Sequence, residues 1–267
     1  PIEYINSAES LIFCKSFAYK EIGCLPKTWN TPGYPIFIAG HMLLFENFIL
    51  YLIISQNILL IITAYFSKKI FDTYNSKYSK WVFALVLYNP NSFSTAQLIQ
   101  TETLFTFFLV ISLYIMHFAV SKRGYFFLGI FFAICAFVRP AFYYFCILSP
   151  IIFYLYLRYI SDLNIRKCLI NASLGGTICL SLVSLWTLRN NNNFNVPVFV
   201  SNAGFMVWAN LEEMNKLNNT GKDINSKYNA IMSEIENIEG YKYGGRQTPL
   251  SSKILLENSK EELDISF

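Results

Sequence analysis

A long run without a charged residue is the feature that most limits how this chain can fold. From Asn47 to Ser67 there is no Asp, Glu, Lys or Arg, and the run ends at Lys68 and Lys69. About 20 predominantly apolar residues are enough for a helix to cross a bilayer. The chain is 54% hydrophobic and 14% charged, with a mean hydropathy of +0.37, whereas soluble domains carry about 25% charged residues. These properties predict an integral membrane protein.

Further apolar segments predict an all-α, polytopic bundle of membrane helices. One segment, residues 124–157, would reach about 51 Å as a single helix. Because Arg139 is costly inside a bilayer and Pro140 breaks helices, we expect two shorter spans that meet there. The roughly six expected spans are residues 47–67, 81–101 (with a polar stretch at Tyr88-Asn89-Pro90-Asn91), 103–120, two within 124–157, and 168–188.

The basic residues predict the orientation of these spans. Crossing at each span places one group of basic residues on the same side: Lys68, Lys69, Lys77, Lys80, Lys122, Arg123, Arg158, Arg166 and Lys167. An excess of Lys and Arg marks the cytoplasmic side. We therefore expect an extracytoplasmic first loop with amphipathic helices at 1–46, the bundle at 47–189, and an extracytoplasmic segment at 190–267.

The cysteines and histidines do not form a recognisable metal motif. Four cysteines fall in expected spans, where cysteine acts as a small apolar residue: Cys135, Cys146, Cys168 and Cys179. Cys14 and Cys24 fall in the outer loop, where an oxidising compartment permits a disulfide bridge. His41 and His117 stand alone in the sequence, which is more typical of packing residues than of metal ligands.

A Pro-Gly-Tyr-Pro motif lies where the polar first segment turns into apolar sequence. Pro32 and Pro35 fix φ and lack a backbone donor, whereas Gly33 permits a positive φ. Tyr34 is of the type that anchors at the headgroup level of a membrane. The motif predicts a shaped turn at the bilayer surface, and a plain interfacial turn is the simpler interpretation.

Ionisable side chains at the ends of expected spans are the candidate functional residues, because charge near a bilayer is costly. Glu102 opens one span, where a carboxylate is also favoured simply by the helix dipole. Arg139 and Arg189 each end a span on the predicted outer side. Guanidinium groups bind phosphate through forked hydrogen bonds, although Arg139 can instead extend toward the headgroups. Asn190 begins an asparagine run that is typical of a loop.

Several short motifs, in this order, resemble the GT-C membrane glycosyltransferases of the dolichyl-phosphate-mannose protein mannosyltransferase and aminoarabinose transferase type. The motifs span residues 3–210: Glu3-Tyr4-Ile5-Asn6-Ser7-Ala8, Thr31–Pro35, Thr101-Glu102-Thr103-Leu104-Phe105, Arg139-Pro140, Trp186-Thr187-Leu188-Arg189-Asn190, Ser201-Asn202-Ala203-Gly204 and Trp208-Ala209-Asn210. The resemblance implies a multi-pass protein of a bacterial inner or plasma membrane with an extracytoplasmic active face.

The resemblance also implies a chemistry. A sugar would pass, with inversion, from a polyprenyl-phosphate carrier to a glycan, lipid or protein acceptor, with membrane lipid but no nucleic acid as a partner. The carboxylate of an acidic residue would act as general base on the acceptor hydroxyl, and cationic residues would receive the phosphate. The implied site comprises Glu102 and Glu3 as catalytic residues, Tyr34, Arg139, Arg189, Asn190 and Asn202 as substrate-binding residues, and Pro32, Gly33 and Pro35 as the loop motif. The resemblance implies no certain cofactor, and it leaves a divalent metal open without a ligand set here.

The chain departs from that family at its amino-terminal end. Enzymes of this type have a first spanning helix and an Asp a few residues before the Glu-Tyr stretch, whereas Pro1 and Ile2 alone precede Glu3 here. We expect the helix and the Asp to lie upstream in a longer protein. The alternatives to an active transferase are a non-catalytic protein that binds or carries lipid-linked sugar, and an inactive fragment of such an enzyme.

Overall fold

The structure is a computed structural model that describes residues 2–20, 23–28, 30–119, 121–161, 163–194 and 197–200. It divides into two compact units. The first, here called the helical unit, comprises Pro1–Ser16 and Thr31–Leu185. The second, here called the hairpin unit, comprises Phe17–Asn30 and Trp186–Phe267. Each unit is described by itself.

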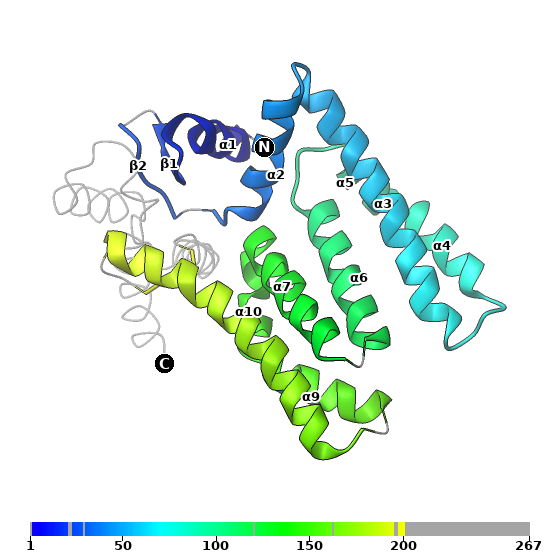
Figure 1. Ribbon diagram of the computed structural model, residues 1–267. Coiled ribbons are helices and arrows are strands. Elements are labelled where there is room, and N and C mark those ends of the chain that lie inside the picture. The colour runs from blue at the N-terminus through cyan, green and yellow to red at the C-terminus, as the bar shows by residue number, and fades with distance from the viewer. Residues whose placement is uncertain are drawn as a thin grey trace, which may run out of the picture. The chain divides into compact units, whose positions relative to one another are not determined.

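The described residues are mostly helical, as the sequence predicts (Figure 1). The helices are α1 (Ile2–Cys14), α2 (Gly33–Leu44), α3 (Phe48–Asp72), α4 (Ser79–Leu87), α5 (Pro90–Ala96), α6 (Glu102–Phe118), α7 (Lys122–Val138), the 3-10 turn η2 (Pro140–Phe142), α8 (Tyr143–Ile147), α9 (Ser149–Ile160) and α10 (Ile165–Phe194). The strands β1 (Ala18–Tyr19) and β2 (Leu25–Pro26) pair antiparallel, with Ala18 opposite Pro26.

Two described helices are long and apolar enough to cross a membrane, α3 and α10. The pair formed by Pro140–Ile147 and Ser149–Ile160 is bent by 64° and would be a third span if it is counted as one. Helices α2 and α6 are apolar but shorter. By length and composition the chain is therefore a membrane protein, whereas a bundle of about six spans stays a prediction.

The expected span at 81–101 is not a continuous helix. Residues in this segment form α4 and α5, with a break at Asn89. The side chain of Asn89 accepts hydrogen bonds from the backbone N–H groups of Asn91 and Ser92 and so caps α5. Pro90 occupies the first turn of α5, where its missing N–H costs nothing. The polar stretch noted in the sequence is therefore a helix boundary.

The break expected at Arg139-Pro140 is confirmed. Helix α7 ends at Val138, and Arg139 has an extended backbone with φ −132° and ψ 109°. A residue that precedes proline is disfavoured in the helical region, and Pro140 then begins η2. The break places Arg139 just beyond the carboxyl end of α7.

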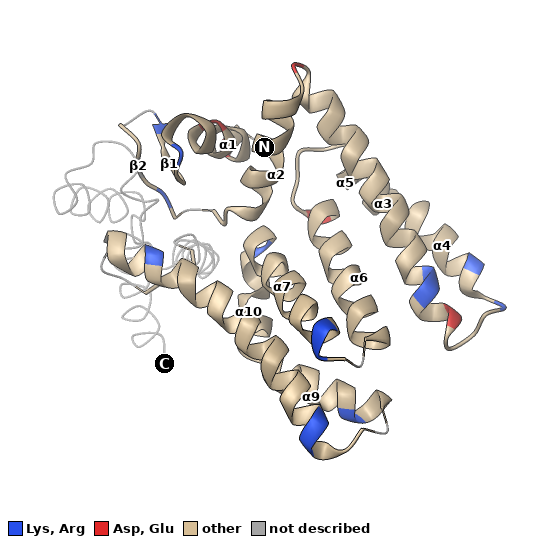
Figure 2. Ribbon diagram, viewed as in Figure 1, with Lys and Arg blue, Asp and Glu red and all other residues tan. Residues whose placement is uncertain are grey.

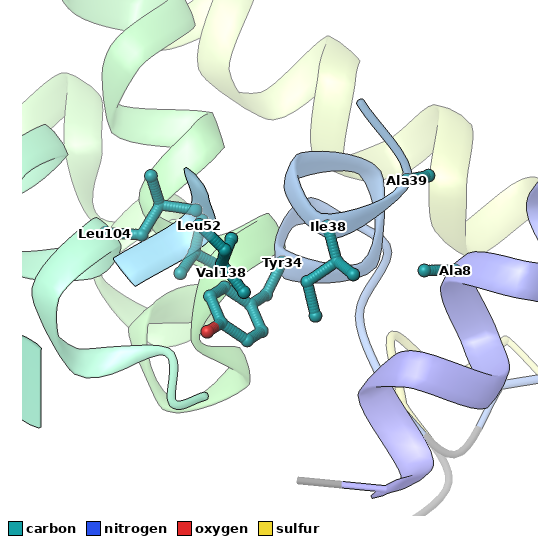
Figure 3. Close-up of a cluster of buried hydrophobic side chains, with 7 residues drawn as sticks. All are labelled: Ala8, Tyr34, Ile38, Ala39, Leu52, Leu104 and Val138. Atoms are coloured by element: carbon teal, nitrogen blue, oxygen red, sulfur yellow. The ribbon is translucent and has the colours of Figure 1, made fainter. Parts of the chain in front are cut away.

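A buried cluster holds the amino-terminal helices of the helical unit against α6 and α7. It contains the apolar side chains of Ala8, Tyr34, Ile38, Ala39, Leu52, Leu104 and Val138 (Figure 3). These residues come from α1, α2, α3, α6 and α7. Because one cluster joins five helices, it fixes the start of α6 and the end of α7 relative to each other.

Basic side chains gather at particular helix ends within the helical unit. Lys and Arg lie at the end of α3, the start of α4, the start of α7, the end of α9 and the start of α10 (Figure 2). Glu102 begins α6 and Arg139 follows the last residue of α7, whereas Lys122 lies at the opposite end of α7. This distribution agrees with the expected charge asymmetry, and the assignment of a cytoplasmic face stays a prediction.

The cysteines behave as the sequence predicts. Cys14 and Cys24 are both disulfide-bonded. The other cysteines are free and buried: Cys135, Cys146, Cys168 and Cys179. Disulfides persist in oxidising compartments, and the extracytoplasmic location of the first loop stays a prediction.

Candidate functional site

An ion pair between Glu102 and Arg139 is the centre of the candidate site. Arg139 Nη1 lies 3.7 Å from Glu102 Oε1, and the two side chains are 47% and 39% exposed. The guanidinium carbon lies 5.7 Å from the centre of the Phe105 ring. Thr101 Oγ1 donates to the other carboxylate oxygen, Oε2, at 3.3 Å. The structure thus brings together two residues that the sequence predicts for the site, and both remain accessible.

The segment that leads into Glu102 is held by a buried amide. Gln56 on α3 is fully buried. Its Nε2 donates to the carbonyl oxygens of Ala96 at 3.0 Å and Leu98 at 2.9 Å, while Oε1 accepts from the Tyr34 hydroxyl at 2.9 Å. An interior amide is stable only when its donors and acceptor are paired. Gln56 therefore fixes the backbone that precedes the carboxylate of the ion pair.

Tyr34 is a core residue, and the expectation that it anchors at the headgroup level is wrong. Its side chain has no exposed surface. Burial raises the pKa of Tyr34 well above its usual range, so the hydroxyl stays a neutral donor to Gln56. Direct contact with a substrate is not available to a side chain in this position, and its effect on the site passes through Gln56.

The Pro-Gly-Tyr-Pro motif begins helix α2 and does not form a positive-φ turn. Pro32 is the N-cap residue with helical backbone angles. Pro35 lies in the first turn, where its missing N–H has no partner to lose. Gly33 is needed for space, because a Cβ there would lie 2.6 Å from the Phe137 carbonyl oxygen and 2.9 Å from the Val138 nitrogen. The motif therefore starts a helix and packs closely beside Arg139, whereas the sequence predicts a shaped turn.

Tyr4 and Glu3 of α1 belong to the same neighbourhood as the ion pair. The Tyr4 ring meets the Tyr34 ring edge-on, with 5.2 Å between centroids. Burial raises the pKa of Tyr4, the negative charges of Glu102 and then Glu3 raise it further, and Arg139 lowers it. Glu3, the other predicted acid, lies exposed in the first turn of α1. Four residues of the predicted site, Glu3, Tyr34, Glu102 and Arg139, thus lie in one region of the helical unit.

Arg189 has a different environment, within the hairpin unit. Its Nη1 donates to the Lys27 carbonyl oxygen at 2.8 Å and to Asn190 Oδ1 at 3.0 Å, and Nη2 donates to the Phe17 carbonyl oxygen at 2.7 Å. Its guanidinium carbon lies 4.9 Å from the centre of the Trp186 ring. These bonds tie the hairpin to the end of α10. A phosphate would therefore have to compete with these bonds for the guanidinium of Arg189.

Asn190 is also a structural residue, and the interpretation of 190–194 as a loop is wrong, because α10 continues to Phe194. Asn190 is fully buried, and its Nδ2 donates to the carbonyl oxygens of Val198 at 2.9 Å and Phe199 at 3.1 Å. Trp186 Nε1 donates to the same Phe199 oxygen at 2.9 Å. The predicted residue Asn202 lies outside the described residues, as does the rest of 201–267.

Sequence reasoning missed the polar triplet Ser55-Gln56-Asn57, which lies inside an apolar run. Each member bonds to residues outside α3. Ser55 pairs with His41 Nε2 at 2.8 Å, while His41 Nδ1 donates to the Phe37 carbonyl oxygen at 2.8 Å. Asn57 Oδ1 accepts from Gln97 Nε2 at 2.9 Å. Three consecutive polar residues in a predicted span are the signal that would have located this buried network.

The described residues hold no group of three or more His, Cys, Asp or Glu side chains that could bind a metal ion. The resemblance leaves a divalent metal open, and the described residues add no ligand set for one. Comparisons of the chain with protein-family models, with curated proteins and with solved structures found no match.

Proposed function

We propose that this chain is part of a membrane glycosyltransferase that takes a sugar from a polyprenyl-phosphate carrier at the extracytoplasmic face. The observation that supports the proposal best is the half-exposed pair of Glu102 and Arg139, at the ends of two apolar helices in a membrane protein. A phosphate-recognising cation and an acid lie side by side there. The proposed setting is the inner or plasma membrane of a bacterium, with a glycan, lipid or protein as acceptor.

Arg139 is the proposed phosphate ligand. Exposed ion pairs contribute about 0–1 kcal/mol, so an incoming phosphate competes easily for the guanidinium. Arginine binds phosphate through two parallel hydrogen bonds, which a single carboxylate oxygen at 3.7 Å does not use fully. When phosphate replaces Glu102 as the partner of Arg139, the Glu102 carboxylate would also become free to accept a proton.

The proposed reaction is a single displacement with inversion. The acceptor hydroxyl oxygen attacks the anomeric carbon while the bond from that carbon to the phosphate oxygen breaks. The hydroxyl proton passes to a carboxylate, either Glu102 or Glu3, and the phosphate leaves with its negative charge facing Arg139. General-base catalysis of this kind contributes about 10²–10⁴-fold.

A binding or carrier protein without transferase activity is the second candidate. It is favoured by the engagement of Glu102, whose two oxygens face Arg139 and Thr101 and not an open acceptor position. In that case Arg139 would still hold the phosphate of the lipid-linked sugar. An inactive fragment would differ from both, because it would neither transfer sugar nor select phosphate.

Binding of radiolabelled polyprenyl monophosphate to the purified chain in nanodiscs tests the first step, with the matching polyprenol as the uncharged reference. We expect Arg139→Ala to weaken phosphate-dependent binding about tenfold or more. The matched control is Arg158→Ala, which removes an exposed arginine at the far end of α9. The assignment of Arg139 would be overturned if both variants lost the same affinity for polyprenyl monophosphate. It would also be overturned if the unsubstituted chain bound polyprenyl monophosphate and polyprenol equally.

Transfer from a panel of polyprenyl-phosphate hexoses and pentoses tests the second step. The Glu102→Gln and Glu3→Gln variants identify the base, since we expect one of them to lose transfer about 10²-fold while it still binds polyprenyl monophosphate. Phosphate-selective binding with no transfer from any donor would favour the carrier. Absence of both activities would favour the inactive fragment.

A further inference from the structure

A groove of about 530 Å³ lies against α7 and α10, far along α7 from the ion pair. It is lined by Lys122, Leu169, Ile170, Ser173, Leu174 and Thr177. Lys122 is in the first turn of α7, and Arg139 follows its last residue, so roughly 25 Å of helix separates the two. The groove is open, since all of its lining residues except Leu174 are exposed.

The groove opens on the exposed face of α10, and α10 packs closely against α7 through its other, buried face. Gly129 on α7 faces the Gly175 carbonyl on α10, and a Cβ on Gly175 would lie 2.7 Å from the Tyr125 carbonyl oxygen. Side chains cannot fill this approach. Small residues on facing membrane helices allow backbones to come close together. This contact fixes α10 against α7 and so holds the groove-lining face of α10 in place relative to Lys122.

The charge of this region is positive and is not balanced along either helix. Arg166 and Lys167 are exposed in the first turn of α10. In the sequence, Asp162 is the one acidic residue between residues 121 and 194, and it lies outside both helices. Beyond Lys122 the groove continues over two hydroxyl residues and three large apolar side chains. A ligand that matches this lining has an anionic head and an apolar chain.

We infer that this groove binds an anionic glycerophospholipid of the membrane. The phosphate lies at Lys122, the hydroxyls of Ser173 and Thr177 receive polar headgroup or ester atoms, and one acyl chain follows the apolar wall. Basic pockets between membrane helices on the cytoplasmic side are suited to anionic headgroups, and this is the side on which the positive-inside pattern places Lys122. The inference concerns a lipid site and goes beyond the proposed transferase function.

Lipid binding to the full chain tests this inference, with native mass spectrometry of detergent-purified protein titrated with phosphatidylglycerol or phosphatidylcholine of identical chains. We expect phosphatidylglycerol to bind more tightly, and Lys122→Gln to reduce that preference about fivefold. Arg123→Gln is the matched control, because it removes the same charge at the neighbouring exposed position, outside the groove lining. We expect it to change the preference less than twofold.

A second variant tests the apolar wall. Leu174→Trp fills the groove without a change in charge, and we expect it to lower the number of tightly bound phosphatidylglycerol molecules by one. Equal binding of the two lipids, or equal effects of Lys122→Gln and Arg123→Gln, would overturn the inference in favour of a neutral lipid or of general surface attraction. A change from dimer to monomer in Leu174→Trp would overturn it in favour of a second copy of the chain.

This test is independent of the proposed function. Arg139→Ala leaves the groove lining intact, so we expect its phosphatidylglycerol binding to match the unsubstituted chain. Loss of lipid selectivity in Lys122→Gln with normal polyprenyl-phosphate binding would support the groove alone. Failure of the Arg139 assignment would therefore not be mistaken for failure of the lipid site.

Discussion

Arg139 follows the last residue of α7 and Arg189 lies within the carboxyl-terminal part of α10, and the surroundings of the two arginines differ. Arg139 faces one carboxylate oxygen at 3.7 Å and is 47% exposed. Arg189 makes three hydrogen bonds, two of them to backbone carbonyls, and stacks on Trp186. The sequence predicts the same phosphate-binding role for both, but three of the five N–H donors of Arg189 already bond to its own chain. An arginine is a candidate ligand site when its present partner is easily exchanged.

The two arginines are also expected to differ in how much each contributes to stability and to function. Removal of Arg189 deletes three hydrogen bonds, although the Phe17 carbonyl oxygen still accepts from the Lys27 N–H at 3.0 Å, and a buried acceptor that loses a partner costs about 1–3 kcal/mol. Removal of Arg139 frees a carboxylate that is already half-exposed and can be hydrated. We therefore expect the arginine that is needed for folding to be the one less available to substrate.

Replacement of Arg189 should give the largest loss of stability. We expect Arg189→Ala to lower the free energy of unfolding by roughly 2–4 kcal/mol, because three charge-assisted hydrogen bonds disappear. Arg189→Lys should recover only part of the loss, since an ammonium group lacks the planar fork that reaches both carbonyls. Denaturant titration in detergent, followed by circular dichroism, measures both variants. A loss below about 1 kcal/mol for the alanine variant would contradict the structural role.

Several features of the fold could be predicted from local sequence. The apolar run after Asn47 is a helix, and the break at Arg139 follows from Pro140. Both depend on properties of neighbouring residues, namely hydropathy over a window and the backbone restriction that proline imposes. The disulfide-bonded state of Cys14 and Cys24 follows from the predicted compartment.

The burial of individual polar residues could not be predicted in this way. Tyr34 is expected at an interface from its residue type, but it lies in the core because Gln56, far along the chain, provides its hydrogen-bond partner. Arg189 is occupied by carbonyls of a hairpin that is remote in sequence. Such pairings depend on tertiary contacts, so a single sequence that offers the correct residue types does not reveal which groups are free.

The second-largest loss of stability is expected at Gly33, which packs against the backbone that precedes Arg139. We expect Gly33→Ala to cost about 1–3 kcal/mol, because its Cβ would approach the Phe137 carbonyl oxygen to 2.6 Å and neither backbone can move freely. Gly40→Ala is the matched control in the same helix, since a Cβ there meets no atom within 4 Å. The control should gain about 0.5–1 kcal/mol from helix propensity. Thermal unfolding of both variants tests the prediction, and equal effects would exclude the close approach.

Tyr34→Phe should cost about 1–2 kcal/mol, because Gln56 Oε1 loses its donor inside the core. The pKa of Tyr34 is raised by burial above its unfolded value of about 10. Its contribution to stability is therefore complete below about pH 10 and is lost as the pH rises toward the folded pKa. Unfolding titrations from pH 8 upward should show a shallower alkaline decline for the variant. An unchanged slope would place the Tyr34 hydroxyl in contact with solvent.

The ion pair should give the smallest effect on stability, and that smallness is what the proposed site requires. A double-mutant cycle of Glu102→Gln and Arg139→Ala should yield a coupling energy of about 0.2–1 kcal/mol, and this value should fall with added salt. The same Arg139→Ala change is expected to weaken polyprenyl-phosphate binding about tenfold. A coupling energy above about 2 kcal/mol would mean that Glu102 holds Arg139 as firmly as the backbone carbonyls hold Arg189. Phosphate would then have to overcome that attachment, and the distinction between the two arginines would disappear.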